Sequence, residues 1–302
     1  MTYAGQLNCY EKCNEILKEF INVEVSPAQV YRVTDTYGEQ IGKEMEKTEC
    51  TLTPVRKDDT LYVELDGSMI FIRKNGWKEA KVGRLFKASD SIRVDGKQGC
   101  ISHSQYLAHL GDSKTFSGKM EELIELYGVL DHRLVFLSDG APWIKNRIED
   151  AFPNAISILD YFHASEHLYS FTASYFKDEE VAKKWAKEQQ ELLLESKVAT
   201  VIENIKALAG TGNEAADNLV AYYESNIDRM DYKRYKQIGC GIIGSGAIDS
   251  AHRTVIQERM KKSGQRWSEE GAQNMLNLRV TKMNGQWQQI IKLVKTNFKA
   301  AA

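Results

Sequence analysis

The sequence predicts a mixed α/β protein, and three observations support this prediction. Residues 61–73 alternate between apolar and polar side chains, as a half-buried strand does, and a turn signal and a second such stretch follow. Two short apolar runs, 134–138 and 155–159, each precede an amphipathic stretch, which indicates strand–helix units. The chain has 302 residues, of which 42% are hydrophobic, enough for one large domain or two smaller ones.

Residues 1–56 are predicted to form a helical N-terminal region. Ser26 is a suitable N-cap, and Pro27 suits the first position of a helix that runs to about Met45. Two helices joined by a short turn form either a plain helical hairpin, the more common case, or part of a DNA-binding domain of the helix-turn-helix kind. The segment 48–60 is the best candidate for a linker.

The central part of the chain, 57–170, is predicted to contain the first part of the sheet. The tripeptide Lys74-Asn75-Gly76 is a hairpin-turn signal between two alternating stretches. The expected elements are strands at 61–73 and 77–89, a third strand between 99 and 107, and a helix at about 114–127. These three antiparallel strands are followed by the two strand–helix units.

An acid ends each of the two later apolar runs. Asp139 follows the first run and Asp160 the second. In mixed sheets ligands gather beyond the carboxyl ends of the parallel strands, where both acids are expected. Residues 171–238, rich in Lys, Glu and Ala, are predicted to be an all-helical insertion. Residues 239–302 return with a glycine-rich segment, a helix that begins near Ala247 and a basic helical tail.

The sequence also bears on the class of protein. It has no apolar stretch long enough to span a bilayer and no signal-peptide profile at the N-terminus, so we expect a cytoplasmic protein. Its five cysteines are scattered, which is not typical of a disulfide framework. Cys9 and Cys13 are four residues apart, but no second pair follows at zinc-finger spacing, so free thiols are the preferred interpretation over a zinc site.

Charge is distributed unevenly along a chain whose net charge is −2. Residues 251–302 contain ten Lys and Arg against three Glu, a charge of +7, so the first 250 residues carry −9. This asymmetry is what a local phosphate-binding surface produces, although a solvated helical face is the more common cause of a single charge run.

Three acids are candidate metal ligands. Asp66 lies within a strong strand, where aspartate is disfavoured by propensity and by desolvation, although a hydrogen-bonded structural role would also account for it. Asp139 precedes a glycine at a strand end, where aspartate is also a routine turn residue or N-cap. Asp249 lies in the first turn of the late basic helix, an ordinary place for an acid. Together, acids from three such elements are what two-metal phosphoryl transfer needs.

Four segments resemble the DDE transposases of bacterial insertion sequences, most closely the ISKra4 group and more distantly the Mutator kind. They are VELDGSMI, LVFLSDGAPWI, ILDYFHASEHL and GSGAIDSAHRTVIQERMKKSGQRWS, and the resemblance covers about residues 57–285. It implies an RNase H-like fold and a site of three acids with two Mg²⁺ ions, or Mn²⁺ in their place. The same resemblance implies double-stranded DNA, as transposon ends and target, as partner, a homo-oligomer on that DNA, and association with the nucleoid.

Carried over by position, Asp66 and Asp139 match the first two catalytic acids. Asp249 stands where the family has glutamate, so its carboxylate is retracted by roughly 1.5 Å, and about 1 Å of misplacement can cost on the order of a hundredfold in rate. Glu258 lies nine residues later, on the opposite face of a regular helix, and is interpreted as a surface acid.

The resemblance also gives accessory and DNA-binding candidates. Asp160 and His163 are similar to an acid-x-x-histidine element of related transposases. His163 and His167 have the spacing of a metal pair, but a hydrogen-bonded structural role is favoured. Trp267 is a candidate for base stacking, with core packing as the alternative. The DNA-binding candidates are Arg253, Arg259, Lys261, Lys262, Arg266 and Trp267.

Three functions remain open at this point. The first is a DNA transposase that hydrolyses a phosphodiester and then joins the freed 3′-hydroxyl to target DNA. The second is a catalytically impaired or truncated transposase-derived protein that still binds DNA. The third is a general metal-dependent nuclease of the same fold, which would show no preference for repeat ends.

Overall fold

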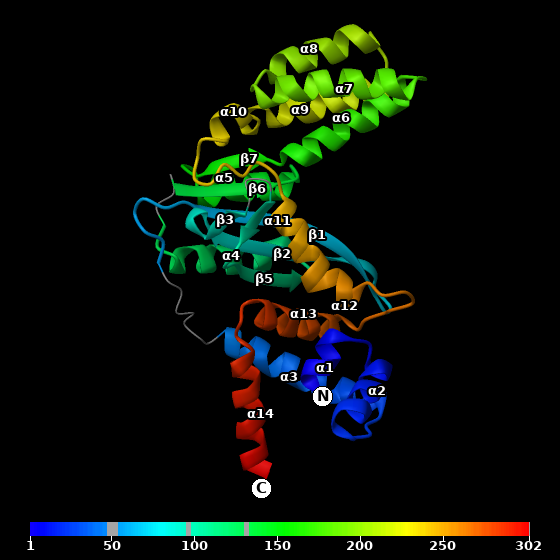
Figure 1. Ribbon diagram of the computed structural model, residues 1–302, viewed down its shortest axis with the longest axis vertical. Coiled ribbons are helices and arrows are strands. Elements are labelled where there is room, and N and C mark those ends of the chain that lie inside the picture. The colour runs from blue at the N-terminus through cyan, green and yellow to red at the C-terminus, as the bar shows by residue number, and fades with distance from the viewer. Residues whose placement is uncertain (47–53, 95–97, 130–132, 302) are drawn as a thin grey trace.

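The computed structural model describes residues 1–46, 54–94, 98–129 and 133–301, and a five-stranded mixed sheet lies at its centre (Figure 1). The strand order is β5-β2-β1-β6-β7. Antiparallel pairs join β1 (Leu61–Ile72) to β2 (Gly76–Lys87) and β2 to β5 (Gln105–Leu110). Parallel pairs join β1 to β6 (Leu134–Ser138) and β6 to β7 (Ile156–Leu159). The predicted mixed α/β class is confirmed.

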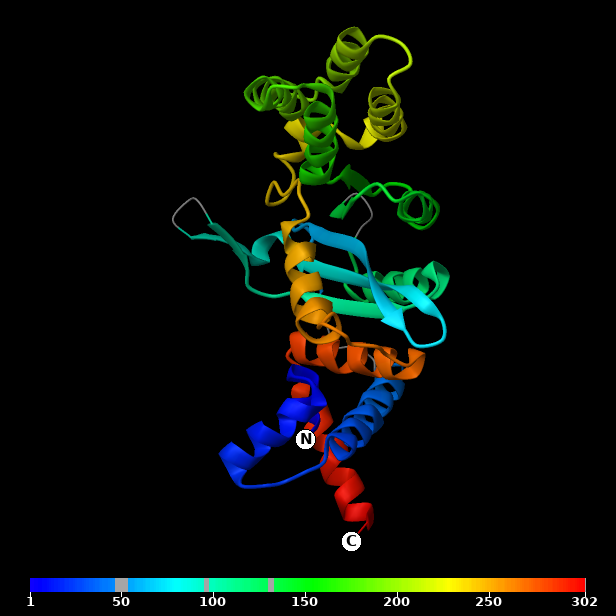
Figure 2. The ribbon, with the colours of Figure 1, turned by 90° about the vertical axis from the view of Figure 1, so that its right-hand side faces the viewer.

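The β1–β2 hairpin turns where the sequence predicts. Ile72 lies opposite Gly76 in the register, and Lys74 takes a left-handed backbone with φ of 71°. The third strand differs from the prediction. Gln98–Ile101 (β4) pairs with Ser91–Val94 (β3) in a separate two-stranded ribbon that projects from the molecule, and β5 takes the third place in the main sheet (Figure 2). β3 follows a short 3₁₀ turn at Ala88–Asp90.

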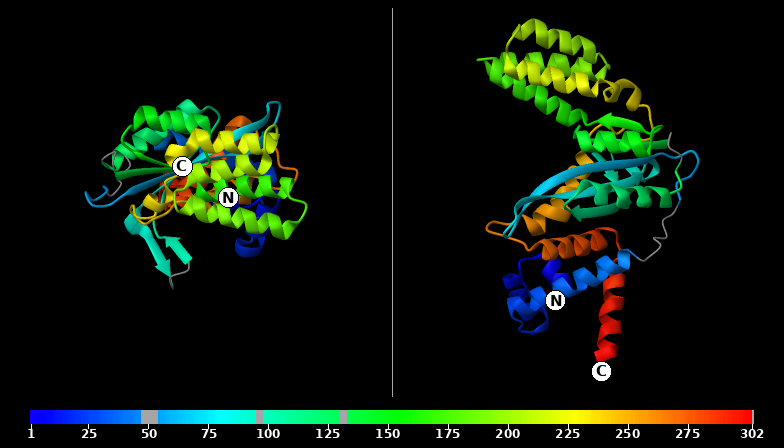
Figure 3. Two further views of the ribbon diagram at one scale, coloured as in Figure 1. Left: turned by 90° about the horizontal axis from the view of Figure 1, so that it is seen from above. Right: turned by 180° about the vertical axis from the view of Figure 1, so that it is seen from behind.

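One face of the sheet is covered by α4 (Ser113–Leu126) and α5 (Pro142–Ala151), seen from behind in Figure 3. Because side chains alternate along a strand, β1 sends Leu61, Val63 and Leu65 to this face, where they form a core with Phe116 and Ile148. The Asp112 carboxylate caps α4 by accepting a hydrogen bond from the Thr115 backbone N–H at 2.8 Å.

The helical insertion covers part of the opposite face and extends to one end of the molecule (Figure 1). Its core reaches Val135, Leu137 and Ile158 of the sheet. All the regular elements described here are helical, as the sequence predicts, and the first is the helix of the second predicted strand–helix unit, which continues into the insertion. They are α6 (Tyr161–Tyr175), α7 (Glu179–Leu194), α8 (Val198–Ala209), α9 (Glu214–Asn226), a 3₁₀ turn at Ile227–Arg229 and α10 (Tyr232–Tyr235).

C-terminal helices cover the rest of that face. Ile248, Val255 and Met275 pack against Ile70 and Val82 of the sheet in a core separate from that of the insertion. We call the boundary between these two covers the seam. The elements are α11 (Gly246–Ala251), a π-helical segment His252–Gln257, α12 (Glu258–Met260), α13 (Glu269–Met283) and α14 (Trp287–Ala301).

The N-terminal helices lie at the end of the molecule opposite the insertion (Figure 1). They are α1 (Thr2–Leu7), α2 (Tyr10–Ile21) and α3 (Pro27–Met45), and α3 packs against α13 and α14. The predicted cap is confirmed, because the Ser26 hydroxyl accepts a hydrogen bond from the Gln29 backbone N–H at 3.1 Å and Pro27 is the first helical residue. Residues 48–53 of the expected linker lie outside the described residues.

Two expectations about protein class can be compared with the structure. The cysteines in the described part of the chain are all free thiols, and the Cys13 thiol contacts the Cys9 carbonyl oxygen at 3.3 Å. These cysteines therefore form no disulfide with one another, and free thiols in preference to a zinc site stay a prediction. None of the helices described is both long and apolar enough to cross a membrane.

Candidate functional site

Three acids stand in a row where the parallel pairings of β1, β6 and β7 end, Asp66 within β1 and Asp139 and Asp160 directly after β6 and β7. The β1–β6 pairing ends with Glu64 opposite Leu137, so two residues further on Asp66 faces Asp139. The β6–β7 pairing ends with Ser138 opposite Leu159, so one residue further on Asp139 faces Asp160. Because residues paired across parallel strands point to the same face, the three side chains share the face that carries the seam. We call Asp66, Asp139 and Asp160 the acid row.

Asp66 contacts a histidine that the sequence reasoning missed. One carboxylate oxygen accepts a hydrogen bond from the Gly67 backbone N–H at 2.6 Å. The other lies 3.1 Å from Nε2 of His252, at an angle too oblique for a hydrogen bond. Burial raises the pKa of Asp66; His252 opposes this effect and the negative charge of Asp139 adds to it. Burial lowers the pKa of His252, which is 4% exposed.

Asp249 faces the acid row from the first turn of α11. Partial burial raises the pKa of its carboxyl, and the negative charges of Asp160 and Asp66 raise it further. Its backbone N–H donates to the Ser245 carbonyl oxygen at 3.1 Å, which fixes the start of the helix. An open polar pocket lies between β1 and this helix, lined by Asp66, Gly67, Ser68, Asp249, His252, Arg253 and Gln257.

The π-helical segment determines which side chains reach this pocket. Its wider turn, with hydrogen bonds from i to i+5, is a feature that often occurs at functional sites. His252 and Arg253 line the pocket, whereas Val255 and Ile256 lie in the core. His252 is not a carboxylate and was therefore not predicted as a site residue. Its position three residues after Asp249, on the same side of a helix, was the signal in the sequence that could have identified it.

Glu64 is a second group that the sequence reasoning missed as a part of the site. It lies two residues before Asp66 on the same face of β1 and is fully buried. Burial raises its pKa to about 8, against the lowering effect of Arg84. The Ile248 backbone N–H also lowers it, although neither carboxyl oxygen has a partner at hydrogen-bonding geometry. Glu64 is therefore largely protonated at neutral pH, directly behind the acid row.

The ordinary structural roles of Asp139 and Asp160 are also present. One oxygen of Asp139 accepts a hydrogen bond from the Ala141 backbone N–H at 3.0 Å, as a turn aspartate does. Asp160 caps α6 by accepting from the Phe162 backbone N–H at 2.8 Å, and its other oxygen accepts from the Ser245 hydroxyl. These bonds fix the two carboxylates at the strand ends and connect Asp160 to the segment that leads into α11.

The carboxylates of the site are suitable ligands for a hard divalent cation, but they are not close enough together to form a complete metal site. Carboxylate oxygens are the protein ligands that Mg²⁺ and Mn²⁺ prefer, and a cation would offset the repulsion that raises the pKa values of Asp66 and Asp249. Within the described residues, however, no group of three His, Cys, Asp or Glu side chains lies close enough to hold a metal ion.

The two histidines of α6 contact each other and their neighbours. The rings of His163 and His167 meet edge to face with centroids 5.1 Å apart, and His167 lies against Tyr222 at 4.4 Å. Nδ1 of His163 lies 3.6 Å from the Glu166 carboxylate. These contacts support the structural interpretation of the pair over a metal site.

The expected DNA contacts of Arg259 and Trp267 are wrong, because both side chains are buried. Arg259 is 0% exposed, donates to the Gly5 carbonyl oxygen at 2.8 Å, and lies between the rings of Tyr10 and Trp267. Trp267 is 5% exposed and donates to the Met260 carbonyl oxygen at 3.1 Å. Both side chains join the N-terminal helices to the C-terminal cover, so core packing, the alternative for Trp267, is confirmed.

The other basic candidates lie at the surface, and the structure adds two residues to them. The Arg73 backbone N–H donates to the Trp267 carbonyl oxygen at 2.7 Å, which brings the β1–β2 turn beside the segment that holds Lys261 and Arg266. Lys262 is half-buried and donates to Asn8. We call the exposed group the basic strip, and among the described residues no acidic side chain lies within 4.0 Å of any of its members: Arg73, Lys74, Arg253, Lys261 and Arg266.

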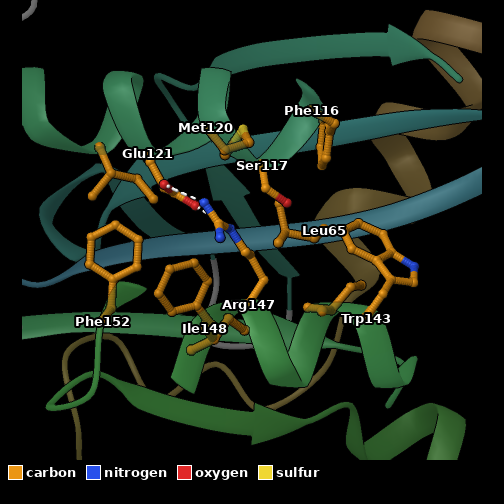
Figure 4. Close-up of a pocket in the computed structure, with 12 residues that line it drawn as sticks. Leu65, Phe116, Ser117, Met120, Glu121, Trp143, Arg147, Ile148 and Phe152 are labelled. Atoms are coloured by element: carbon orange, nitrogen blue, oxygen red, sulfur yellow. Dashed lines mark hydrogen bonds and ion pairs between the residues drawn. The ribbon is translucent and has the colours of Figure 1, made fainter. Parts of the chain in front are cut away.

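A second pocket lies on the other face of the sheet and is not a binding site. It is lined mainly by apolar side chains of α4, α5 and β1, including Leu65, Phe116 and Trp143 (Figure 4). The Arg147 guanidinium donates two hydrogen bonds to Glu121 across it, at 2.7 and 2.9 Å. The cavity volume is about 20 Å³, room for about one water molecule, so it is a packing gap in the core.

Comparison with known proteins gives one relative and one family. The chain is 24% identical over 272 residues to a Streptococcus gallolyticus protein described as "UPF0236 protein in vanSb 3'region". The match covers 86% of this chain and 57% of that protein, so the chain spans little more than half the length of this relative. A family model with the description "Uncharacterised protein family (UPF0236)" matches residues 3–297. With a match over nearly its whole length, the chain belongs to the family UPF0236.

Proposed function

We propose that this chain carries the catalytic core of a DNA transposase of the DDE kind, with an RNase H-like fold. The observation that carries the proposal is the acid row, because Asp66 within β1 stands beside Asp139 and Asp160 at the ends of β6 and β7, while Asp249 faces them from a later helix. The strand order supports it too: three antiparallel strands are followed by two parallel ones in strand–helix units.

In the proposed reaction Asp66, Asp139 and Asp249 would be the groups that hold two Mg²⁺ ions, or Mn²⁺. The chemistry supplied there would be activation of the attacking hydroxyl and stabilisation of the leaving oxygen at the scissile phosphate. The chain's own residues position this site. His252 contacts Asp66, Ser245 joins Asp160 to the start of α11, and the basic strip supplies charge for the DNA backbone.

The proposal also covers organisation and partners. The helices α1–α3 belong to an N-terminal region of residues 1–56 that takes part in DNA binding, and the core is divided by the insertion into 57–170 and 239–302. Double-stranded DNA, as element ends and target, is the partner. A homo-oligomer forms on this DNA, because two ends have to be brought together for transposition.

Strand cleavage tests the proposal. The substrate is duplex DNA from the flanks of the gene, with any inverted repeat included, and cleavage is measured with Mg²⁺ or Mn²⁺ for the wild type and Asp66→Ala. We expect metal-dependent cleavage at the repeat ends by the wild type only. Equal cleavage by both proteins, or none by either, would contradict catalysis, and cleavage without preference for ends would indicate a general nuclease.

A second candidate is a transposase-derived protein that binds DNA without cutting it. It is favoured by the shorter third acid, Asp249, and by the absence of an assembled three-ligand group among the described residues. It predicts that repeat-end DNA is bound with the same affinity by the wild type and by Asp66→Ala, with no product from either.

A further inference from the structure

Phe162 is an exposed aromatic side chain beside the acid row, and neither the proposed chemistry nor the core uses it. It is 58% exposed at the second position of α6. A phenylalanine is usually buried, and the neighbouring Tyr161 is 7% exposed within the core of the insertion. Exposure alone is not unusual, since Phe20 is 81% exposed, so the argument depends on where the ring of Phe162 lies.

Short connections place the ring next to the acids. The Phe162 backbone N–H is bonded to Asp160, and the side chain lies directly against the backbone of Gly244, where a Cβ would overlap the ring. Ser245, the next residue, bonds to Asp160 through its hydroxyl and to the Asp249 backbone N–H through its carbonyl oxygen. The Phe162 ring thus belongs to the second residue after Asp160 and rests on Gly244, five residues before Asp249.

The ring is also held in place before any ligand arrives. One edge rests on Gly244, and the Tyr161 ring meets it edge to face with centroids 5.5 Å apart. Because glycine at 244 leaves the room that the ring occupies, this position depends on the absence of a side chain there. A fixed, exposed ring loses little conformational freedom when it binds a flat partner.

The surroundings favour a nucleobase over a protein partner. The side chains that follow on α6, His163, Glu166 and His167, are polar and at least partly exposed, so Phe162 is not the centre of an apolar patch of the kind that proteins bind. A nucleobase is a planar group joined through its sugar to a phosphate, and the phosphate-handling carboxylates lie beside this ring. Stacking on an aromatic ring needs an unpaired base, because the faces of a paired base are covered in the duplex.

We propose that Phe162 stacks on an unpaired base next to the phosphodiester that the acid site binds. The proposal rests on the proposed function and adds the state of the substrate: the strand is locally unpaired on the insertion side of the site, and duplex lies along the basic strip. Stacking of this kind tolerates any base, so Phe162 reads the opened strand and not its sequence.

Binding measurements on the full chain test the proposal without cleavage. Fluorescence anisotropy is recorded in a metal-free buffer with two probes, a blunt duplex and the same duplex with a short single-stranded overhang. We expect Phe162→Ala to weaken binding of the overhang probe by about 5- to 150-fold and to leave the blunt duplex unchanged. Phe162→Trp should retain binding, whereas Phe162→Leu, apolar but without a π-face, should lose it.

Phe20→Ala is the matched control, because Phe20 is 81% exposed on α2, far from the site in the fold. The proposal is overturned if Phe162→Ala and Phe20→Ala bind the overhang equally, or if Phe162→Leu binds as the wild type does. It is also overturned if Phe162→Ala changes only the oligomeric state in light scattering, since the ring would then contact another protein. The two proposals can fail separately. If the protein shows no Asp66-dependent cleavage, the transposase proposal is contradicted. If Phe162→Ala still loses binding of the overhang probe, base stacking on Phe162 remains supported.

Discussion

Asp249 illustrates at the scale of one residue how small a change separates a site from a surface acid. Its carboxylate lines the same pocket as Asp66, and the repulsion between these acids raises its pKa. The described residues nevertheless hold no three-ligand group. A glutamate at this position is one methylene longer, so its carboxylate reaches closer to the acid row than that of Asp249.

The change Asp249→Glu is therefore expected to raise metal-dependent cleavage, by about 10- to 100-fold, since about 1 Å of misplacement can cost that much. The measurement is the initial rate of strand cleavage with Mg²⁺. Asp249→Asn keeps the length but removes the charge, and serves as the matched control that should not gain activity. An Asp249→Glu protein no faster than the wild type would contradict a catalytic role for this position.

Glu64 gives a prediction about pH. Its pKa is raised from 4.5 to about 8 in the folded protein, so between these values the folded state holds a proton that the unfolded state has released. The free energy of unfolding must then fall as the pH rises through this range, by up to a few kcal/mol, and become level above it.

The variant Glu64→Gln removes this dependence because its side chain stays neutral. Thermal unfolding at about pH 6 and about pH 9 should show the wild type losing stability relative to Glu64→Gln at the higher pH. Glu122→Gln, at an exposed position of α4, should follow the wild type. Parallel curves for the wild type and Glu64→Gln would mean that Glu64 is already ionised in the folded protein.

At the scale of elements, α12 and the loop after it give two nearby arginines opposite environments. Arg259 is enclosed between aromatic rings, whereas Arg266 is exposed in the loop that follows. We expect Arg259→Ala to lower stability by about 2 to 5 kcal/mol, the usual cost of emptying a core position, without a specific effect on DNA.

The same substitution at Arg266 should do the reverse, with weaker DNA binding at unchanged stability. Chemical denaturation and anisotropy on a blunt duplex distinguish the two, each variant acting as the control for the other. Weaker DNA binding at unchanged stability in Arg259→Ala would mean that the side chain leaves the core to reach DNA.

A sequence prediction succeeds for an element when the residues that determine the element are close together in the chain. The β1–β2 hairpin and the Ser26 cap were predictable, because alternation and capping are encoded within a few residues. The β3–β4 ribbon was not, because its residues and those of β5 are equally strand-like and only tertiary pairing assigns them to different sheets. The burial of Arg259 was hidden for a similar reason, since contacts with Gly5 and Tyr10 come from the far end of the chain.

The acids of the site could be predicted from the sequence, but the residues that surround them could not. Asp66, Asp139 and Asp160 were predictable as strand-end or strand acids, and the parallel register places them in one row. Glu64 and His252 required the structure, because what makes them notable is burial and a contact across the seam.

At the scale of the whole molecule, the sheet lies between the insertion at one end and the N-terminal helices at the other (Figure 1). The basic strip runs from the pocket at Arg253 to the β1–β2 turn, on the side away from the insertion. Its charges have no acidic partner among the described residues, although Lys261 donates to the Ser68 hydroxyl at 3.1 Å, and such charges can contact phosphates.

Replacing four residues of the strip, Arg73, Lys74, Lys261 and Arg266, by glutamine should make DNA binding less sensitive to salt. Each lost phosphate contact lowers the slope of log K against log salt concentration by about 0.9 for duplex DNA. Titrations at several salt concentrations measure the slope. Glutamine at Lys184 and Lys187, two exposed lysines of α7, is the matched control and should leave it unchanged.

The seam has a thermodynamic consequence. Asp160 is held by the insertion side and Asp249 belongs to the C-terminal cover, so the spacing of the acids depends on how the two covers sit on the sheet. A DNA strand that contacts both covers would favour one spacing, and cation binding would favour the same one. Affinities coupled in this way are reciprocal, typically by about 5- to 150-fold. Calorimetric titration with Ca²⁺, a cation with similar oxygen ligands, should therefore show that the protein binds Ca²⁺ more tightly when DNA is present. In that case the substrate itself would complete the metal site.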